Sequence, residues 1–189
     1  KLTLPDGSKA EGQAVLLHAC CAPCSAAIVE CMLRNGMKPT VYFSNSNIYP
    51  QQEYDVRKHE LKRFLEAQNV PYVEDEYDHH EWLSVITGLE DEPERGSRCS
   101  VCFQFRFSHA AKYAQEHGFH LLTTTLASSR WKNIRQIDTA GHLAVEAYPD
   151  VEWWDMNWRK GGLQNRRGEL LRINEFYNQL YCGCEFSMR

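Results

Sequence analysis

Seven of the eight cysteines in this sequence fall into three short groups whose spacing suits metal binding or redox chemistry. The groups are Cys20, Cys21 and Cys24; Cys99 and Cys102; and Cys182 and Cys184. Two cysteines separated by two residues at the start of a helix can direct both sulfurs to one metal, and the unpaired N-H groups there favour thiolate over thiol. Soft thiolates in this number select zinc or an iron-sulfur cluster. Metal or redox use is therefore favoured over structural disulfides.

The number of thiols helps to separate zinc binding from redox chemistry. A structural zinc site would take four thiolates, for which the sequence offers Cys21, Cys24, Cys99 and Cys102. Cys20 and the thiols of residues 182–184 would then have no purpose, whereas a redox site can use them for electron delivery. Residues 182–184 are open to three interpretations: a redox dithiol, a pair of ligands, or a tail with no special role. Cys31 is interpreted as a buried structural thiol.

The elements that position these cysteines alternate between apolar runs and helical patterns. Residues 14–19 are predicted to form a buried strand that leads into the first cysteines and a helix through Arg34. Further strands are predicted at residues 40–43, 71–73, 119–126 and 151–154, and further helices at residues 53–68, 80–89, 98–117, 131–148 and 164–176. This alternation predicts a single-domain, right-handed parallel α/β sheet with helices on both faces and a helical C-terminal extension. We expect the domain to span residues 14–189, after a polar segment at residues 1–13.

Polar side chains are predicted at the carboxyl edge of this sheet, where open α/β folds bind their ligands. His18 shares a strand face with Cys20, and a ligand or proton donor is weighed there against a satisfied core histidine. Asn45 and Asn47 follow the second strand, where turn formation is the alternative to ligand binding. Asp78 follows the third strand, and a general acid or oxygen ligand is weighed there against a helix cap.

Charge is distributed unevenly along a chain whose formal net charge is -4. Nine acidic residues and no Lys or Arg lie between residues 74 and 94, whereas residues 130–135 and 159–172 are predominantly basic. The net charge argues against indiscriminate nucleic-acid binding, and the pattern fits either an acidic and a basic face or two ordinary solvated surfaces. No apolar run suits a membrane span, and the polar start of the chain lacks a signal-peptide pattern. We expect a cytoplasmic protein with no membrane partner and an N-terminus trimmed to Lys1.

Several segments of the chain together resemble the epoxyqueuosine reductases of the QueH type, a family unrelated to the cobalamin-dependent enzyme with the same activity. These segments are HACCAPCS, NSNIYP followed by EYDVR, YDHHEW, EPERGSRCSVCFQFR, TTTLASS, NWRKGG and YCGCEFS. The resemblance extends from Leu16 to Ser187, and CCAPC combined with a later CxxC and a terminal YCGC is highly specific. It implies a Rossmann-like sheet that resembles the nucleotide-binding domains of tRNA thiolases.

The activity that the resemblance implies is reductive deoxygenation of epoxyqueuosine to queuosine at the wobble position of tRNA. The implied cofactor is an iron-sulfur cluster of the 4Fe-4S type, with or without an additional iron ion, and no cobalamin. Because the first turn is CCAPCS, without the glycines of a phosphate loop, we expect no ATP. The electron donor is not identified by the sequence.

The resemblance also implies roles for individual residues. The expected core cluster ligands are Cys20, Cys21, Cys99 and Cys102, with Cys24 as an alternate or a ligand of a second metal. Cys182 and Cys184 are expected to serve the second metal or a redox relay, Asp78 and His18 to donate protons or act as outer ligands, and Asn45 and Asn47 to hold the cyclopentane hydroxyls. The tRNA is expected to contact a basic rim of Arg130, Lys132, Arg135, Arg159, Lys160, Arg166 and Arg167, and to stack on Trp131 and Trp158 unless these lie in the core.

Two functions of other classes fit the same residues. One is a zinc-stabilised tRNA-binding module without catalysis, which would be colourless. The other is a metal-free thiol-disulfide oxidoreductase that works through the Cys-Gly-Cys tail. Anaerobic purification followed by an absorption spectrum and iron and sulfide analysis distinguishes the iron-sulfur enzyme from these alternatives.

Overall fold

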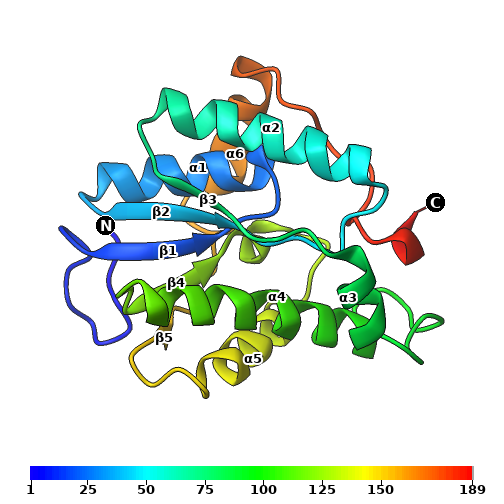
Figure 1. Cartoon of the computed structure of the whole chain (residues 1–189). Helices are drawn as coiled ribbons and strands as arrows, with labels where there is room; N and C mark the ends of the chain where they lie inside the picture. Colours follow the sequence, from blue (N-terminus) through cyan, green and yellow to red (C-terminus); the bar gives the residue numbers. More distant parts are fainter. Residues whose placement is uncertain (189) are drawn as a thin grey trace.

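The structure, a computed structural model, describes residues 1–188. Among these residues, five strands form one sheet in the order β3-β2-β1-β4-β5, and all neighbouring pairs are parallel (Figure 1). The strands are β1 (Ala14–His18), β2 (Lys38–Phe43), β3 (Tyr72–Glu74), β4 (Leu121–Thr124) and β5 (Glu152–Trp153). The helices are α1 (Ala22–Arg34), α2 (Gln51–Ala67), α3 (His79–Val85), α4 (Ser97–Glu116), α5 (Ile134–Val145) and α6 (Leu163–Ile173), with short 3-10 helices η1 (Thr125–Ser128) and η2 (Glu185–Ser187).

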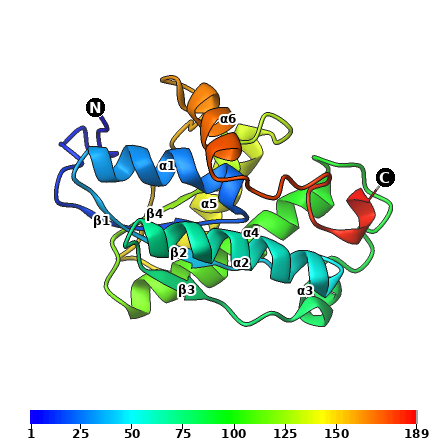
Figure 2. The ribbon, with the colours of Figure 1, turned by 90° about the horizontal axis from the view of Figure 1, so that it is seen from above.

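Helices cover both faces of the sheet. α1, α2 and α6 lie over one face, and α4 and α5 lie over the other (Figures 1 and 2). Two apolar cores fill the interfaces, one around Leu17, Met32 and Leu65 and the other around Phe107 and Ile137. The run Ala14–Leu17 of β1 is uninterrupted and apolar, as expected for a strand covered on both faces. The predicted parallel α/β fold is confirmed.

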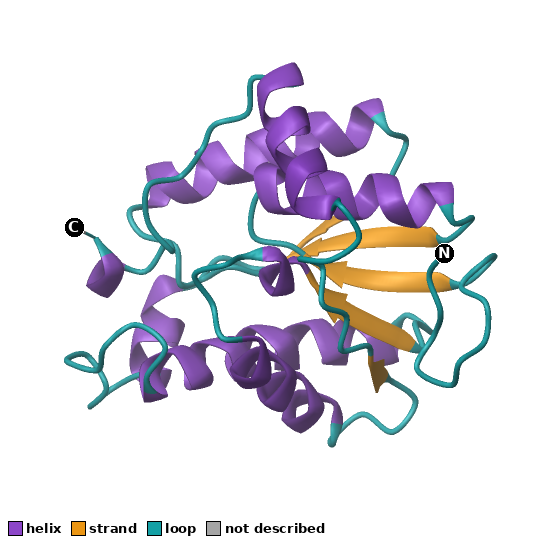
Figure 3. Cartoon of the chain, turned by 180° about the vertical axis from the view of Figure 1, so that it is seen from behind, coloured by secondary structure: helices purple, strands orange, loops and turns teal. Residues whose placement is uncertain are grey.

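The carboxyl edge of the sheet gathers several turns that are distant in sequence. β1 pairs with both β2 and β4, so the turn after β1 lies between the turn after β2 and η1. The C-terminal segment, residues 174–187, leaves α6 and crosses this same edge, on the side to which the strand arrows point (Figure 3). Cys20, just after β1, therefore lines the same cavity as Cys182 and Cys184, although most of the chain separates them.

Two element boundaries differ from the sequence prediction because side chains cap the backbone. The helix expected from residue 131 begins at Ile134, since Asn133 accepts hydrogen bonds from the N-H groups of Arg135 and Gln136. The strand expected through residue 126 ends at Thr124, whose hydroxyl accepts a hydrogen bond from the N-H of Leu126 and starts η1. Both caps are the local hydrogen bonds that Asn and Thr offer in competition with regular structure.

The first residues of the chain lie against the domain. Leu2 and Leu4 pack on the core that α1 covers, and the N-H of Leu2 donates to Asn35 at 2.9 Å. The division of the chain at residue 14 stays a prediction. Within residues 1–188, no helix combines the length and the apolar character that crossing a membrane requires.

Candidate metal and substrate site

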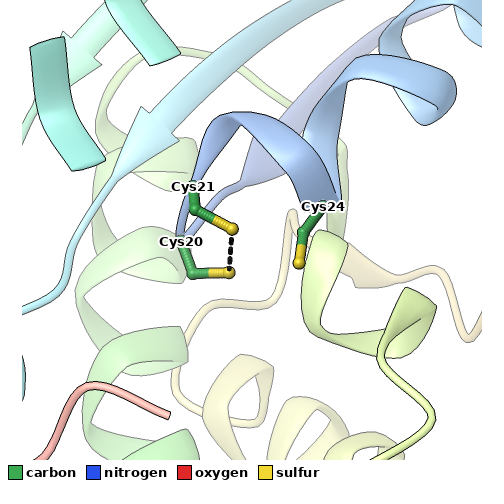
Figure 4. Close-up of side chains that lie close together, drawn as sticks. All are labelled: Cys20, Cys21 and Cys24. Carbon is green, nitrogen blue, oxygen red and sulfur yellow. Dashed lines mark hydrogen bonds between the residues drawn. The ribbon is translucent and has the colours of Figure 1, made fainter. Parts of the chain in front are cut away.

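The first cysteine group forms a compact triad at the turn from β1 into α1 (Figure 4). The Sγ atoms of Cys20, Cys21 and Cys24 all lie within 4.8 Å of one another, and those of Cys20 and Cys21 are 3.5 Å apart. All three side chains are buried. α1 begins at Ala22, which places Cys24 in its first turn beside the two preceding cysteines.

Ionisation is shared unequally within this triad. Burial raises the pKa of the Cys21 thiol. Hydrogen bonds from Cys20 and Cys21 hold the pKa of Cys24 well below the ordinary thiol value, and the charges of Arg167 and Lys132 add to the effect. A thiolate flanked by two further sulfurs is a donor set for a soft metal.

A cavity of about 410 Å³ opens at the carboxyl edge and brings the three cysteine groups together. Its lining includes Cys20, Cys24, Cys99, Cys182 and Cys184. Cys102 lies behind this lining in an apolar cluster with Trp82 and Cys184, and burial raises its pKa to about 11. The volume falls within the range of about 300–1,000 Å³ that small-molecule sites occupy.

The C-terminal segment is held over the cavity by a buried arginine. Arg57 of α2, only 1% exposed, donates to the carbonyl oxygens of Cys182 at 3.0 Å and Tyr181 at 3.1 Å. Its Nε also donates to Glu53 at 2.7 Å. Gly183 has a φ of 129°, and a Cβ there would lie 3.0 Å from Ile48, so this turn needs glycine. The sequence prediction did not include Arg57.

Lys132 is turned into the cavity instead of standing on an outer rim. Its Nζ donates to the Cys182 Sγ at 2.9 Å and lies 5.5 Å from the centre of the Phe103 ring. Burial opposes ionisation of Cys182, but the Lys132 ammonium outweighs it and lowers the pKa of that thiol. This pair therefore places a second thiolate in the cavity.

Two of the predicted site residues have all their polar groups engaged within the protein. His18 is fully buried; its Nε2 donates to the Ser44 carbonyl at 3.0 Å, and its Nδ1 accepts from the Thr124 hydroxyl at 2.9 Å. Burial lowers its pKa to about 3, so the ring is neutral. Asn45 donates to the carbonyl of Ala19 and accepts from Arg106. Neither side chain is part of the cavity lining, and both brace the carboxyl edge.

Three amide side chains in the cavity lining, those of Asn47, Gln136 and Gln179, carry a buried oxygen with no hydrogen-bond partner among residues 1–188. The Oδ1 atom of Asn47, a residue only 1% exposed, is buried and has no hydrogen-bond partner among residues 1–188. The Oε1 atom of Gln179 is likewise buried and without a hydrogen-bond partner among these residues, while the Nε2 atom of Gln179 donates to the Cys21 Sγ at 3.0 Å. Asn47 was predicted, whereas Gln179 carries no local sequence signal.

Asp78 lies away from the cavity lining and caps α3. Its side chain is exposed and accepts a hydrogen bond from the N-H of Glu81 at 2.9 Å. The structure thus favours the cap over the general acid. Asp75, three residues earlier, instead accepts hydrogen bonds from Ser44 at 2.6 Å and His109 at 2.8 Å.

Two of the seven residues of the predicted basic rim, Lys132 and Arg167, belong to the cavity lining. Arg130 and Lys160 are exposed and do not line the cavity. Arg159 donates to the carbonyls of Ser129 and Lys132, and Arg166 pairs with Glu30 at 2.8 Å. Arg57, Arg95, Arg98 and Arg106, which were not predicted, complete the cationic lining.

The two tryptophans considered for base stacking lie in different environments. Trp158 is fully buried in the core that α1 covers, as its alternative interpretation expected. Trp131 is 80% exposed and lines the cavity. Only Trp131 is available for contact with a ligand.

A parallel α/β sheet with converging thiols at its carboxyl edge and a cationic cavity beside them defines a Rossmann-like protein of metal or redox chemistry. The family model described as epoxyqueuosine reductase QueH matches residues 15–189. The chain therefore belongs to the QueH family, as its sequence motifs predicted.

Individual relatives agree with the family assignment. The chain is 48% identical over 189 residues to the epoxyqueuosine reductase QueH of Histophilus somni, covering 100% of this chain and 76% of that protein. It is 46% identical to the QueH of Acinetobacter baylyi, covering 100% of this chain and 85% of that protein. Among solved structures, the U34-tRNA thiolase NcsA from Methanococcus maripaludis with its 4Fe-4S cluster matches with a TM-score of 0.61 at 14% identity, covering 99% of this chain and 65% of that protein. This last similarity confirms the expected relation to the fold of a tRNA thiolase.

Proposed function

We propose that this chain is an epoxyqueuosine reductase that acts on tRNA. Two C-O bonds of the epoxide break, a C=C bond forms, and two electrons and two protons convert the oxygen to water. The family assignment over residues 15–189 carries this proposal. The thiol-lined cavity supports it, because it offers a protected site for a reduction.

The thiols fit an iron-sulfur cluster. Cys20, Cys21 and Cys24 already lie within 4.8 Å of one another, and Cys99 lines the same cavity. We therefore propose Cys20, Cys21, Cys99 and Cys102 as ligands of a 4Fe-4S cluster, with Cys24 as an alternate or a ligand of an additional iron. Such a cluster would supply electrons, and because the four thiolates would occupy all four of its irons, a Lewis acid for the epoxide oxygen would have to be the additional iron.

The protein's own polar groups suit the rest of the substrate. The unpartnered oxygens of Asn47 and Gln179 can accept hydrogen bonds from the cyclopentane hydroxyls or the adjacent amine. Asn45 acts as a positioning residue, since its amide holds the turn after β1 through the Ala19 carbonyl. Lys132 brings a protonated amine to the cavity, where a departing oxygen needs a proton.

Anaerobic purification followed by absorption spectroscopy and iron, sulfide and zinc analysis tests the cofactor. Conversion of epoxyqueuosine tRNA with an artificial reductant, followed by mass spectrometry of the released nucleosides, tests the reaction. We expect iron, sulfide and queuosine. A protein that contains zinc and leaves the epoxide intact supports the binding module, and conversion without metal supports a dithiol route through Cys182 and Cys184.

Two matched substitutions locate the chemistry. Cys99→Ala should abolish conversion, whereas Cys31→Ala should preserve it, because Cys31 lies on α1 outside the cavity lining.

Asp78→Asn keeps a capping oxygen but removes the acid. If Asp78 donates a proton, this variant loses conversion while keeping its thermal stability; if Asp78 only caps α3, both are kept, which is the result we expect from its exposed position.

A further inference from the structure

The two most exposed large apolar side chains given by the structure stand at the same cavity. Leu180 is 94% exposed and Trp131 is 80% exposed, and both belong to the cavity lining. Ile173, which is 68% exposed on α6, does not line it. Single exposed apolar residues are ordinary, but two at the mouth of one functional cavity form a contact surface.

The backbones that carry these two side chains are fixed from different parts of the fold. Trp131 lies between η1 and α5, and its carbonyl accepts a hydrogen bond from Arg95 at 2.8 Å. Leu180 lies in the C-terminal segment, where Arg57 holds the next carbonyl, that of Tyr181. Two anchored backbones thus present two uncovered side chains, so little ordering is needed when a ligand contacts them.

The charges at the cavity identify the kind of ligand that fits between them. Six cationic side chains line the cavity, against one acidic residue, Glu94. Arg57, Arg98 and Arg106 are buried and bonded within the protein, and Lys132 is paired with Cys182, so Arg95 and Arg167 are the cations that remain to meet a ligand's negative charge. A ligand that offers both negative charge and flat apolar faces is single-stranded nucleic acid, whose phosphates suit the cations and whose bases stack on aromatic side chains. A duplex offers phosphates without accessible base faces.

We infer that Trp131 and Leu180 form an apolar clamp for the nucleobase next to the nucleotide that enters the cavity. Trp131 stacks on the face of that base, and Leu180 packs against it from the C-terminal segment. This inference rests on the proposed function only in that the occupant of the cavity is an RNA nucleotide. The clamp selects an unpaired anticodon loop over a helical region and draws the flanking base out of its stack.

Intrinsic fluorescence reports directly on the clamp. Of the five tryptophans, Trp82, Trp153, Trp154 and Trp158 are at most 2% exposed, so quenching by acrylamide is confined to Trp131. An anticodon stem-loop RNA with guanosine at the wobble position should protect this fluorescence, and a fully paired RNA of the same length should not. Unchanged quenching with saturating stem-loop, or no binding of the stem-loop, overturns the inference.

Affinity provides the second test. Trp131→Ala should raise the Kd for the stem-loop about 5- to 150-fold, the equivalent of about 1–3 kcal/mol for one stacked base. Trp131→Phe should restore most of the affinity, and Leu180→Ala should weaken binding in the same direction. Ile173→Ala is the matched control and should bind like the parent chain. Equal Kd values for Trp131→Ala and Ile173→Ala would refute the clamp.

The salt dependence separates stacking from charge. Trp131→Ala should lower affinity without changing the slope of log Kd against log salt, whereas Arg167→Ala should reduce that slope. These binding measurements require no deoxygenation. If the stem-loop protects Trp131 from quenching but the protein leaves epoxyqueuosine intact, the proposed function is refuted and the clamp stands. If Trp131→Ala converts epoxyqueuosine tRNA with unaltered KM and Kd, the clamp is refuted and the proposed function stands.

Discussion

Replacing Arg57 by methionine should release the C-terminal segment from the cavity. The guanidinium is 1% exposed and links Glu53 to the carbonyls of Tyr181 and Cys182. Methionine fills a similar volume but makes none of these bonds. Hydrogen bonds to a charged group are each worth about 1.5–3 kcal/mol, and breaking a buried ion pair costs about 3–5 kcal/mol. We therefore expect the free energy of unfolding to fall by about 3–5 kcal/mol.

Urea unfolding measures that loss, and Arg34→Met provides the comparison. Arg34 makes an ion pair with Glu30 at 2.9 Å, but its side chain is 72% exposed, so its loss should cost under about 0.5 kcal/mol. Limited proteolysis should also cut Arg57→Met earlier within residues 174–187 than the parent chain, and conversion of the substrate should fall. A loss of stability below about 1 kcal/mol, with parental proteolysis, would show that Arg57 does not anchor the segment.

The remaining predictions concern pH and packing. A hydrogen bond to Asp75 raises the pKa of His109; burial would raise the pKa of Asp75, but the bonds from His109 and Ser44 outweigh it and lower that pKa. The pair therefore stabilises the folded protein most at pH values between the unfolded pKa of Asp, about 3.9, and that of His, about 6.5. The free energy of unfolding should fall as the pH rises through the raised pKa of His109. The fall should be smaller in His109→Gln. Gly141→Ala should destabilise by about 1–3 kcal/mol in urea unfolding, since its Cβ would lie 2.1 Å from Trp153, whereas Gly168→Ala, with open space around it, should stabilise α6 by about 0.5–1 kcal/mol.

The fold could be predicted from the sequence because each segment carries its own burial pattern. The apolar run of β1 and the amphipathic pattern of α1 identify a strand and a helix without knowledge of the rest. Strand order cannot be predicted from local patterns in this way, since it depends on the face of the sheet that each crossover connection covers. The pairing of β1 with both β2 and β4 was therefore not predicted, although it is what places η1 beside the cysteine turn.

The thiol groups could be predicted because their members are close in sequence and at element junctions. The polar groups around them could not, because their roles depend on partners far along the chain. Gln179 reaches Cys21 across 158 positions, and Arg57 reaches Cys182 across 125. Neither residue differs locally from an ordinary surface glutamine or helix arginine.

Local charge was a poor guide to the cationic surface for the same reason. Lys132 and Arg166 both lie in basic stretches, yet one faces the Cys182 thiol and the other is neutralised by Glu30. Arg98 stands beside the acidic stretch but is buried against the carbonyls that end it, and it lines the cavity. The role of each cationic side chain in this fold is set by the carbonyl, thiol or carboxylate that the tertiary structure places beside it. The cavity therefore collects positive charge around its thiols while the chain as a whole stays acidic.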